Sequence, residues 1–133
     1  MATVPLELVA PEKLLFSGEI VSIILPSVDG EMQVMPGHAP LIAMLQPGVI
    51  TIDTGAGAPQ RLFVRGGIAE IRPDNISVLA DYAVPMAEFS VEAIAIEIAM
   101  VEKVHVAART DDTRFAASVK LMRLTELRAT ILH

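Results

Sequence analysis

The chain contains no cysteine and no tryptophan, and its 133 residues include one tyrosine and four phenylalanines. Without cysteine there is no disulfide framework, no thiolate-ligated metal and no cysteine nucleophile. The three histidines, at positions 38, 105 and 133, lie too far apart in the sequence to indicate a metal site. We therefore expect neither a metal ion nor a cofactor.

Basic residues are also scarce, since 10 Lys and Arg stand against 16 Asp and Glu and give a net charge of −6. A nucleic-acid-binding protein needs a basic face to displace counterions, so this class is excluded. The chain is 53% apolar and has a mean hydropathy of +0.54, which excludes a disordered chain. The composition favours a binding or mechanical part over an enzyme.

Glycine and proline are absent from the last 48 residues, because all nine prolines and all eight glycines occur at or before Pro85. The charge divides at the same point, with −5 on residues 1–85 and −1 on residues 86–133. Frequent Gly and Pro between short apolar runs are typical of strands joined by tight turns, whereas their absence permits helices. We predict two modules, 1–85 and 86–133.

The first module contains short runs rich in β-branched residues, at 20–25, 49–52 and 76–79. Arg72-Pro73-Asp74-Asn75 has the residues of a tight turn, and a second turn is predicted at 28–31. Closely spaced strands without helical spacers predict a β-sandwich or a barrel.

The second module carries two apolar stripes at helical spacing. Between them, Thr110 or Asp111 can cap a helix. We predict two antiparallel helices, with Glu88, Glu92 and Glu97 in solvent. The stripes are Val91, Ile94, Ile98 and Val101, followed by Ala117, Leu121, Leu124, Leu127 and Ile131.

Membrane insertion and export are not predicted. The longest stretch without a charged residue, 32–52, contains three prolines and two glycines, which would leave backbone groups unsatisfied in lipid. The first five residues show neither a signal peptide nor a transit peptide, so we expect the chain to stay where it is made or to be in its mature form.

No catalytic constellation is found. Gly55-Ala56-Gly57 begins like a dinucleotide fingerprint, but Pro59 and Gln60 follow where the motif requires a helix N-terminus. Ser27 lies outside any Gly-x-Ser-x-Gly frame. His38 lies in Met35-Pro36-Gly37-His38-Ala39-Pro40 and is either a loop histidine bonded to backbone groups or part of a contact surface.

Around His38 the chain resembles the epsilon subunit of bacterial rotary, F-type ATP synthase. The resemblance extends to Pro47-Gly48-Val49-Ile50, to residues 65–71 and 75–80, and to Leu6–Lys13 with Phe16-Ser17-Gly18. It is dense over residues 6–85, whereas beyond them only the helical pattern agrees. Its signature stretch is Leu25-Pro26-Ser27-Val28-Asp29-Gly30-Glu31-Met32-Gln33-Val34-Met35-Pro36-Gly37-His38-Ala39-Pro40-Leu41.

The resemblance implies an α+β fold, with an N-terminal ten-stranded β-sandwich followed by a C-terminal antiparallel two-helix hairpin. It also implies a non-catalytic subunit of the central rotor stalk that couples proton flow to ATP synthesis. The implied partners are the gamma subunit and the polar loops of the membrane-embedded c-ring. The implied location is the cytoplasmic face of the bacterial inner membrane, as a peripheral protein. A stand-alone nucleotide-sensing or small-ligand-binding β-sandwich is the alternative.

By the same analogy, two loops would lie together at the end of the sandwich that faces the c-ring. Asp29 and Glu31 could then meet basic residues of the ring. The residues expected in these loops are Ser27, Val28, Asp29, Gly30, Glu31 and His38.

In the family, the hairpin folds against the sandwich or extends into the alpha/beta catalytic head, where it blocks ATP hydrolysis. Some members bind ATP through Ile/Leu-Asp-x-x-Arg-Ala, but here Ala95 replaces the Asp and Ile98 replaces the Arg. We therefore predict no ATP binding. Lys120 and Arg123 share a side of the second helix and are either inhibitory contacts with the head or solvated positions.

Overall fold

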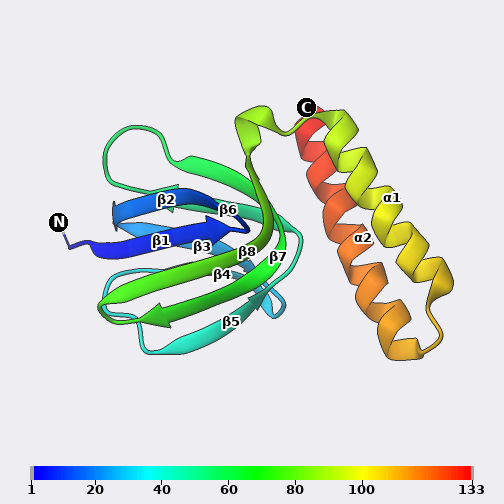
Figure 1. The fold of residues 1–133 in the computed structure, drawn as a ribbon, viewed down its shortest axis with the longest axis horizontal. Helices are drawn as coiled ribbons and strands as arrows, with labels where there is room; N and C mark the ends of the chain where they lie inside the picture. Colours follow the sequence, from blue (N-terminus) through cyan, green and yellow to red (C-terminus); the bar gives the residue numbers. More distant parts are fainter. Residues whose placement is uncertain (1, 133) are drawn as a thin grey trace. The chain divides into compact units, whose positions relative to one another are not determined.

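The computed structural model describes the backbone of residues 2–132 and the side chains of residues 2–129. In this part the chain forms eight strands, one short 3-10 helix and two α-helices (Figure 1). The strands are β1 (Val4–Ala10), β2 (Lys13–Ile20), β3 (Ser22–Ser27), β4 (Gly30–Val34), β5 (Leu41–Leu45), β6 (Gly48–Asp53), β7 (Gln60–Arg72) and β8 (Asn75–Pro85). The helices are η1 (Met86–Glu88), α1 (Val91–Ala107) and α2 (Asp111–Leu132).

The chain divides into two compact units, Met1–Ala87 and Glu88–His133. The first holds the eight strands and the second holds α1 and α2, while η1 spans the division. The expected class, a β-sandwich followed by a two-helix hairpin, is confirmed. Neither helix is long and apolar enough, over the residues described, to cross a membrane.

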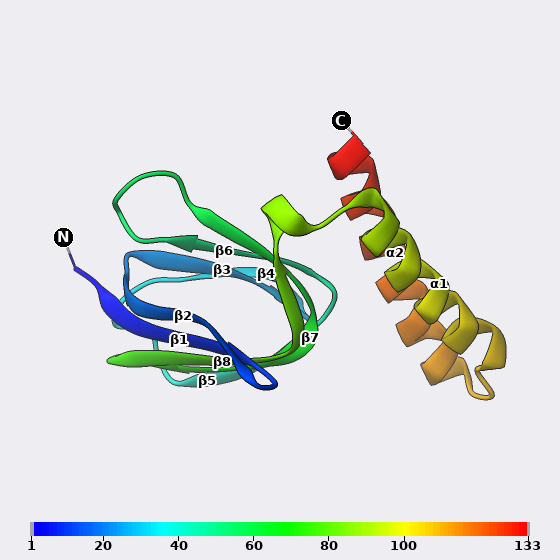
Figure 2. The same ribbon diagram turned by 45° about the horizontal axis from the view of Figure 1, so that its top comes forward.

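The two long strands β7 and β8 belong to both layers of the sandwich. The first part of β7 pairs with β6, and its second part pairs with β5. The first part of β8 lies beside β1, and its end pairs with the start of β7. Figure 2 shows these two strands bending from one layer into the other. The expected number of ten strands is therefore corrected to eight in the described chain, because each long strand runs unbroken through both layers.

The bend in β7 depends on two adjacent glycines. The pairing register with β8 shifts on both sides of Gly66, and Gly67 has a φ of +147°. A Cβ atom on Gly67 would lie 2.2 Å from the carbonyl oxygen of Leu79. Only glycine combines this backbone conformation with so close an approach, so this bulge is built into the sequence.

The core lies between the two layers and is filled by alternating side chains. In β1, Val4, Leu6 and Leu8 are buried, whereas Pro5 and Glu7 are exposed. Each fully buried aliphatic side chain contributes about 1.5–3 kcal/mol of hydrophobic stabilisation. The other large side chains that are fully buried in the sandwich are Ile20, Ile23, Leu25, Ile50, Ile52, Phe63 and Ile71.

Side-chain caps start both helices of the hairpin. The Ser90 hydroxyl accepts from the Ala93 N–H at 3.1 Å, and the Thr110 hydroxyl accepts from the Thr113 N–H at 3.1 Å. The helices pack side by side in antiparallel directions (Figures 1 and 2). Of the predicted stripes, Ile94, Ile98, Ala117 and Leu124 are buried, Val101, Leu121 and Leu127 are partly buried, and Val91 is exposed at the start of α1. The side chain of Ile131 lies outside the described residues.

Candidate functional site

The turn between β3 and β4 is built by Ser27. Its hydroxyl donates to the carbonyl oxygen of Gly30 at 2.6 Å and accepts from the N–H of Asp29 at 3.2 Å. The residue is 5% exposed, so its side chain faces into the protein. Ser27 therefore shapes the turn and cannot offer its hydroxyl to a partner.

Gln46 supports this turn from the neighbouring chain segment. Its buried amide Nε2 donates to the carbonyl oxygen of Ser27 at 2.6 Å, and its backbone N–H donates to Pro26 at 2.9 Å. A third bond joins the N–H of Val28 to the carbonyl of Met44 at 2.9 Å. Gln46 was not predicted from the sequence, where its one signal is an amide side chain between Leu45 and Pro47 in an apolar run.

The tip of the turn projects into solvent. Val28, Asp29 and Glu31 are exposed, and Gly30 takes a φ of +121° that most residues avoid. Among the described residues, neither the Asp29 nor the Glu31 carboxylate has an ion pair or a side-chain hydrogen bond. A rigid turn thus presents two free carboxylates and one apolar side chain.

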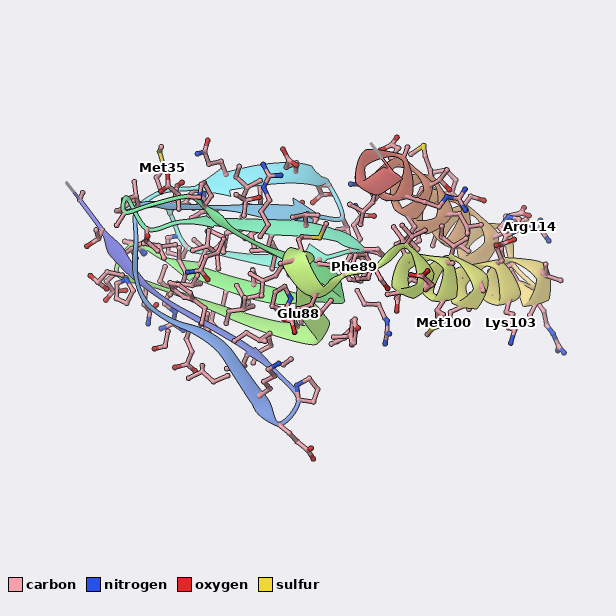
Figure 3. All side chains as sticks on the ribbon, turned by 90° about the horizontal axis from the view of Figure 1, so that it is seen from above. Met35, Glu88, Phe89, Met100, Lys103 and Arg114 are labelled. Atoms are coloured by element: carbon pink, nitrogen blue, oxygen red, sulfur yellow. The ribbon has the colours of Figure 1, made fainter. Side chains whose placement is uncertain are left out.

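His38 lies at the other end of β4. Its Nδ1 donates to the carbonyl oxygen of Ala39 at 2.7 Å, and the N–H of Gly37 donates to Pro73 at 3.1 Å, so the loop is fastened to the β7–β8 turn. Figure 3 labels Met35, the first residue after β4, which opens this loop. The expectation that His38 and the Ser27–Glu31 turn share one end is wrong. The two connections flank the same strand, whose five residues separate them by about 16 Å.

The outward face of the layer β5-β7-β8-β1-β2 carries an apolar row. One side chain from each strand pairs with the next through the strand register: Met44, Ile68, Leu79, Val9 and Leu14. Four of these side chains are strongly exposed, at 53% for Met44, 41% for Ile68, 58% for Leu79 and 59% for Leu14. Single exposed apolar residues are ordinary on a protein surface, whereas a contiguous row across five strands makes this face a candidate interaction surface.

A more polar row borders the apolar row on the same face. It follows the register from Ile42 through Glu70, Ser77 and Glu7 to Ser17. Neither row was predicted from the sequence, because each strand contributes one residue to each row. Only the pairing of the strands brings those residues together.

In the hairpin, the positions of the degenerate ATP motif differ in exposure. Ala95 is exposed, whereas Ile98 is 7% exposed and fills the position where the family pattern has an arginine. Glu97 is 6% exposed, which corrects the expectation that it lies in solvent. It shares a side of α1 with the buried Ile94, three residues earlier, and the partly buried Val101, four residues later.

The two basic residues singled out on α2 also differ. Lys120 is exposed, but Arg123 is partly buried, and its Nε atom has no hydrogen-bond partner among the residues that the structure describes. On α1, Ile96, Met100 and Val104 recur every fourth residue and are exposed. Figure 3 shows Met100 and Lys103 projecting from the side of α1. The hairpin therefore leaves one apolar helix face open.

Comparison with known proteins gives the family. The profile described as "ATP synthase, Delta/Epsilon chain, beta-sandwich domain" matches residues 3–86. The ATP synthase epsilon chain of Parvibaculum lavamentivorans is 43% identical over 125 residues, which cover 94% of this chain and 95% of the relative. The chain belongs to the ATP synthase epsilon-chain family. The resemblance seen in the sequence is thereby confirmed.

Other members of the epsilon-chain family match about two thirds of the chain. The epsilon chain of Granulibacter bethesdensis is 47% identical over 90 residues, which cover 68% of this chain and 67% of the relative. The epsilon chain of Rhodospirillum rubrum is 45% identical over 92 residues, which cover 69% of each.

Solved structures show the same fold at lower identity. One match is a chain of the Euglena gracilis mitochondrial ATP synthase, from a structure titled OSCP/F1/c-ring in rotational state 1. The TM-score is 0.75 at 22% identity, and the match covers 100% of this chain and 83% of that chain. A chain of the Tetrahymena thermophila mitochondrial ATP synthase, titled central stalk/cring, matches with a TM-score of 0.69 and 17% identity, covering 94% of this chain and 96% of that one.

Proposed function

We propose that this chain is the central-stalk subunit of a proton-translocating ATP synthase that links the gamma subunit to the c-ring. In this function the chain is itself non-catalytic and couples rotation of the ring to ATP synthesis. Membership of the epsilon-chain family supports the proposal, as does the likeness to chains from structures titled for the F1/c-ring and the central stalk. The complex holds the chain peripherally on the cytoplasmic face of the bacterial inner membrane.

The apolar row is the structural observation that best supports the proposal. A subunit that transmits torque needs a rigid body with a broad contact face, and a close-packed sandwich supplies the rigidity. The exposed side chains of Met44, Ile68 and Leu79 lie on neighbouring strands and become buried when a partner docks on them. Burial contributes about 25 cal/mol per Å² of apolar surface. We assign this face to the gamma subunit.

The Ser27–Glu31 turn is the proposed contact with the polar loops of the c-ring. Ser27 and Gln46 hold the backbone of the turn, while Val28, Asp29 and Glu31 contact the ring. Free carboxylates at the rim of an interface steer and orient a basic partner more than they strengthen its binding. His38 has no part in this contact because it lies beyond the other end of β4.

Residues 1–85 form the coupling module, and residues 86–133 form a hairpin that regulates ATP hydrolysis. Its open apolar face on α1 and the basic residues Lys120 and Arg123 on α2 are suited to a contact with the alpha/beta catalytic head. ATP binding is not part of this function, because Ala95 and Ile98 replace the polar residues of the family pattern.

The proposed docking of gamma is tested with Leu79→Asp in the full chain. The variant is added to an alpha/beta/gamma complex that lacks this chain, and binding is measured by co-purification and by titration. We expect at least tenfold weaker binding, because the charge must be buried against an apolar partner. Gln33→Asp on β4 is the matched control, since it adds the same charge at an exposed site outside the row. Equal binding of both variants would show that the apolar row is not the docking face.

A further inference from the structure

A cleft of about 500 Å³ lies beside the start of β2, entirely within the first compact unit. The tip of the β1–β2 hairpin, the start of β7 and the end of β8 enclose it. Its lining residues are Lys13, Leu14, Leu15, Pro59, Gln60, Arg61, Leu62, Pro85, Met86 and Ala87.

Among the described residues, the charged ones that line the cleft are two cations, Lys13 and Arg61. They are two of the four basic residues in a module that carries −5. Both are exposed, and within the described part of the chain neither side chain has an ion pair or a hydrogen bond. By contrast, Arg72, another basic residue of the module, is paired with Glu70. Apart from these two cations and Gln60, the lining is apolar, and two unpaired cations in such a concave site favour an anionic group with an apolar neighbour.

The cleft is continuous with the apolar row through Leu14. This residue lines the cleft and is also the last member of the row, where it pairs with Val9. Lys13, directly before it, pairs with Ala10 at the tip of the hairpin. A partner that covers the row as far as Leu14 therefore reaches the mouth of the cleft.

We propose that the cleft receives an acidic segment of the partner that docks on the apolar row, which is the gamma subunit if the proposed function holds. One carboxylate of this segment lies between Lys13 and Arg61, and the guanidinium group of Arg61 can bind it with two parallel hydrogen bonds. A neighbouring apolar side chain of the segment packs on Leu14 and Met86. Attachment thus combines a non-directional apolar contact with a charged contact that fixes the register.

The charged contact has its own signature in the binding kinetics. Charges near the edge of an interface speed association and make it depend on salt, whereas apolar contacts mainly slow dissociation. Removing the two cations should therefore lower the association rate and flatten its salt dependence. Removing an apolar member of the row should raise the dissociation rate.

The test uses the full chain and the alpha/beta/gamma complex that lacks it. The double variant Lys13→Gln/Arg61→Gln is compared with Lys103→Gln/Arg109→Gln, which removes the same charge at exposed sites outside the cleft and breaks no ion pair among the described residues. We expect the cleft variant to bind about tenfold more weakly at low salt, with a salt dependence shallower than that of the control. A cleft variant that matches the control in affinity and salt dependence would overturn the proposal.

Three further outcomes distinguish failure of the acidic-segment proposal from failure of the docking row or of the proposed function. If Leu79→Asp weakens binding while the cleft variant equals its control, the docking row stands and only the acidic segment is refuted. If the unmodified chain does not bind the complex at all, the proposed function itself fails. If the isolated chain binds inorganic phosphate or octanoate through Lys13 and Arg61, while these substitutions leave attachment to the complex unchanged, the occupant is a small anion and the proposal is wrong.

Discussion

The side-chain amide of Gln46 donates a 2.6 Å hydrogen bond to the carbonyl oxygen of Ser27, and both residues are buried. This bond connects the end of β5 to the turn that presents Asp29 and Glu31. The amide of a residue nineteen positions further along the chain thus holds the backbone of this short turn in one conformation.

Gln46→Leu keeps the approximate size of the side chain but removes the donor. The carbonyl of Ser27 then has one hydrogen bond fewer in a buried site, and we expect a loss of about 1–3 kcal/mol in the free energy of unfolding. Chemical denaturation of the full chain measures this loss. Gln33→Leu, at an exposed site on β4, is the control and should change stability by less than about 0.5 kcal/mol. Equal stability of the two variants would contradict the role of Gln46.

Charge reversal at Asp29 and Glu31 should weaken attachment to the c-ring. Because both carboxylates are exposed and unpaired among the described residues, Asp29→Lys/Glu31→Lys should leave the fold intact while repelling basic loops. We expect lower retention of the chain on ring-containing complexes, most clearly at low salt. Asp74→Lys/Glu102→Lys, at two exposed sites outside this turn with no ion pair among the described residues, provides a control of equal charge, and unchanged retention in the first variant would refute the contact.

Gly67→Ala should be among the most damaging substitutions in the sandwich. Its Cβ would meet the Leu79 carbonyl oxygen at 2.2 Å, and the φ of +147° is unfavourable for alanine. We expect a loss of about 3 kcal/mol or more in the free energy of unfolding. Gly57→Ala is the matched control, because Gly57 also has a positive φ but its Cβ would meet nothing within 4 Å. Similar losses in both variants would show that the close approach to Leu79 is unimportant.

The hairpin should not bind ATP, and restoring the family's arginine should not restore binding. Calorimetric titration with ATP at physiological concentrations should give no heat of binding. Ile98→Arg places a charge at a position that is 7% exposed, so it should also destabilise the hairpin. Ala95→Asp, at an exposed position, should be nearly neutral. A clear titration with the unmodified chain would disprove the first expectation.

Deletion of residues 88–133 should raise ATP hydrolysis by the assembled complex if the hairpin is inhibitory. Lys120→Glu/Arg123→Glu should reproduce part of this rise, because reversal of the charges opposes contact with an acidic surface. Lys103→Glu, which changes an exposed lysine on α1, tests whether any loss of positive charge has the same effect. Hydrolysis rates that stay unchanged after the deletion would rule out an inhibitory role.

Local patterns were enough to predict the class of fold. The β-branched runs and turn residues up to Pro85 predicted the sandwich, and the i, i+3, i+7 spacing of Ile94 and Ile98 with their neighbours predicted the hairpin. The number of ten strands, which the resemblance implied, was wrong because β7 and β8 each continue as one strand through both layers. At Gly66 and Gly67 the register shift bends β7 without ending it, which only the pairing with β8 reveals.

The candidate contacts were predictable only in part. The turn around Asp29 was recognisable because its residues are neighbours in the sequence. The apolar row was not, since Val9, Met44 and Leu79 come from distant strands and only the register brings them to one face. The same limit applies to the cleft, where Lys13 and Arg61 are separated by 47 intervening residues.

The amino-acid sequence by itself determined the two modules, the lack of cysteine chemistry and the resemblance to a rotor subunit, because these depend on composition and on short contiguous motifs. Tertiary structure alone decided which exposed residues act together. It separated His38 from the Ser27–Glu31 turn by the length of β4, and it assembled the apolar row and the cation-lined cleft. The physical reason is that strand pairing and side-chain packing join residues distant in sequence, and these joined residues, rather than any single motif, form the surfaces a partner can recognise.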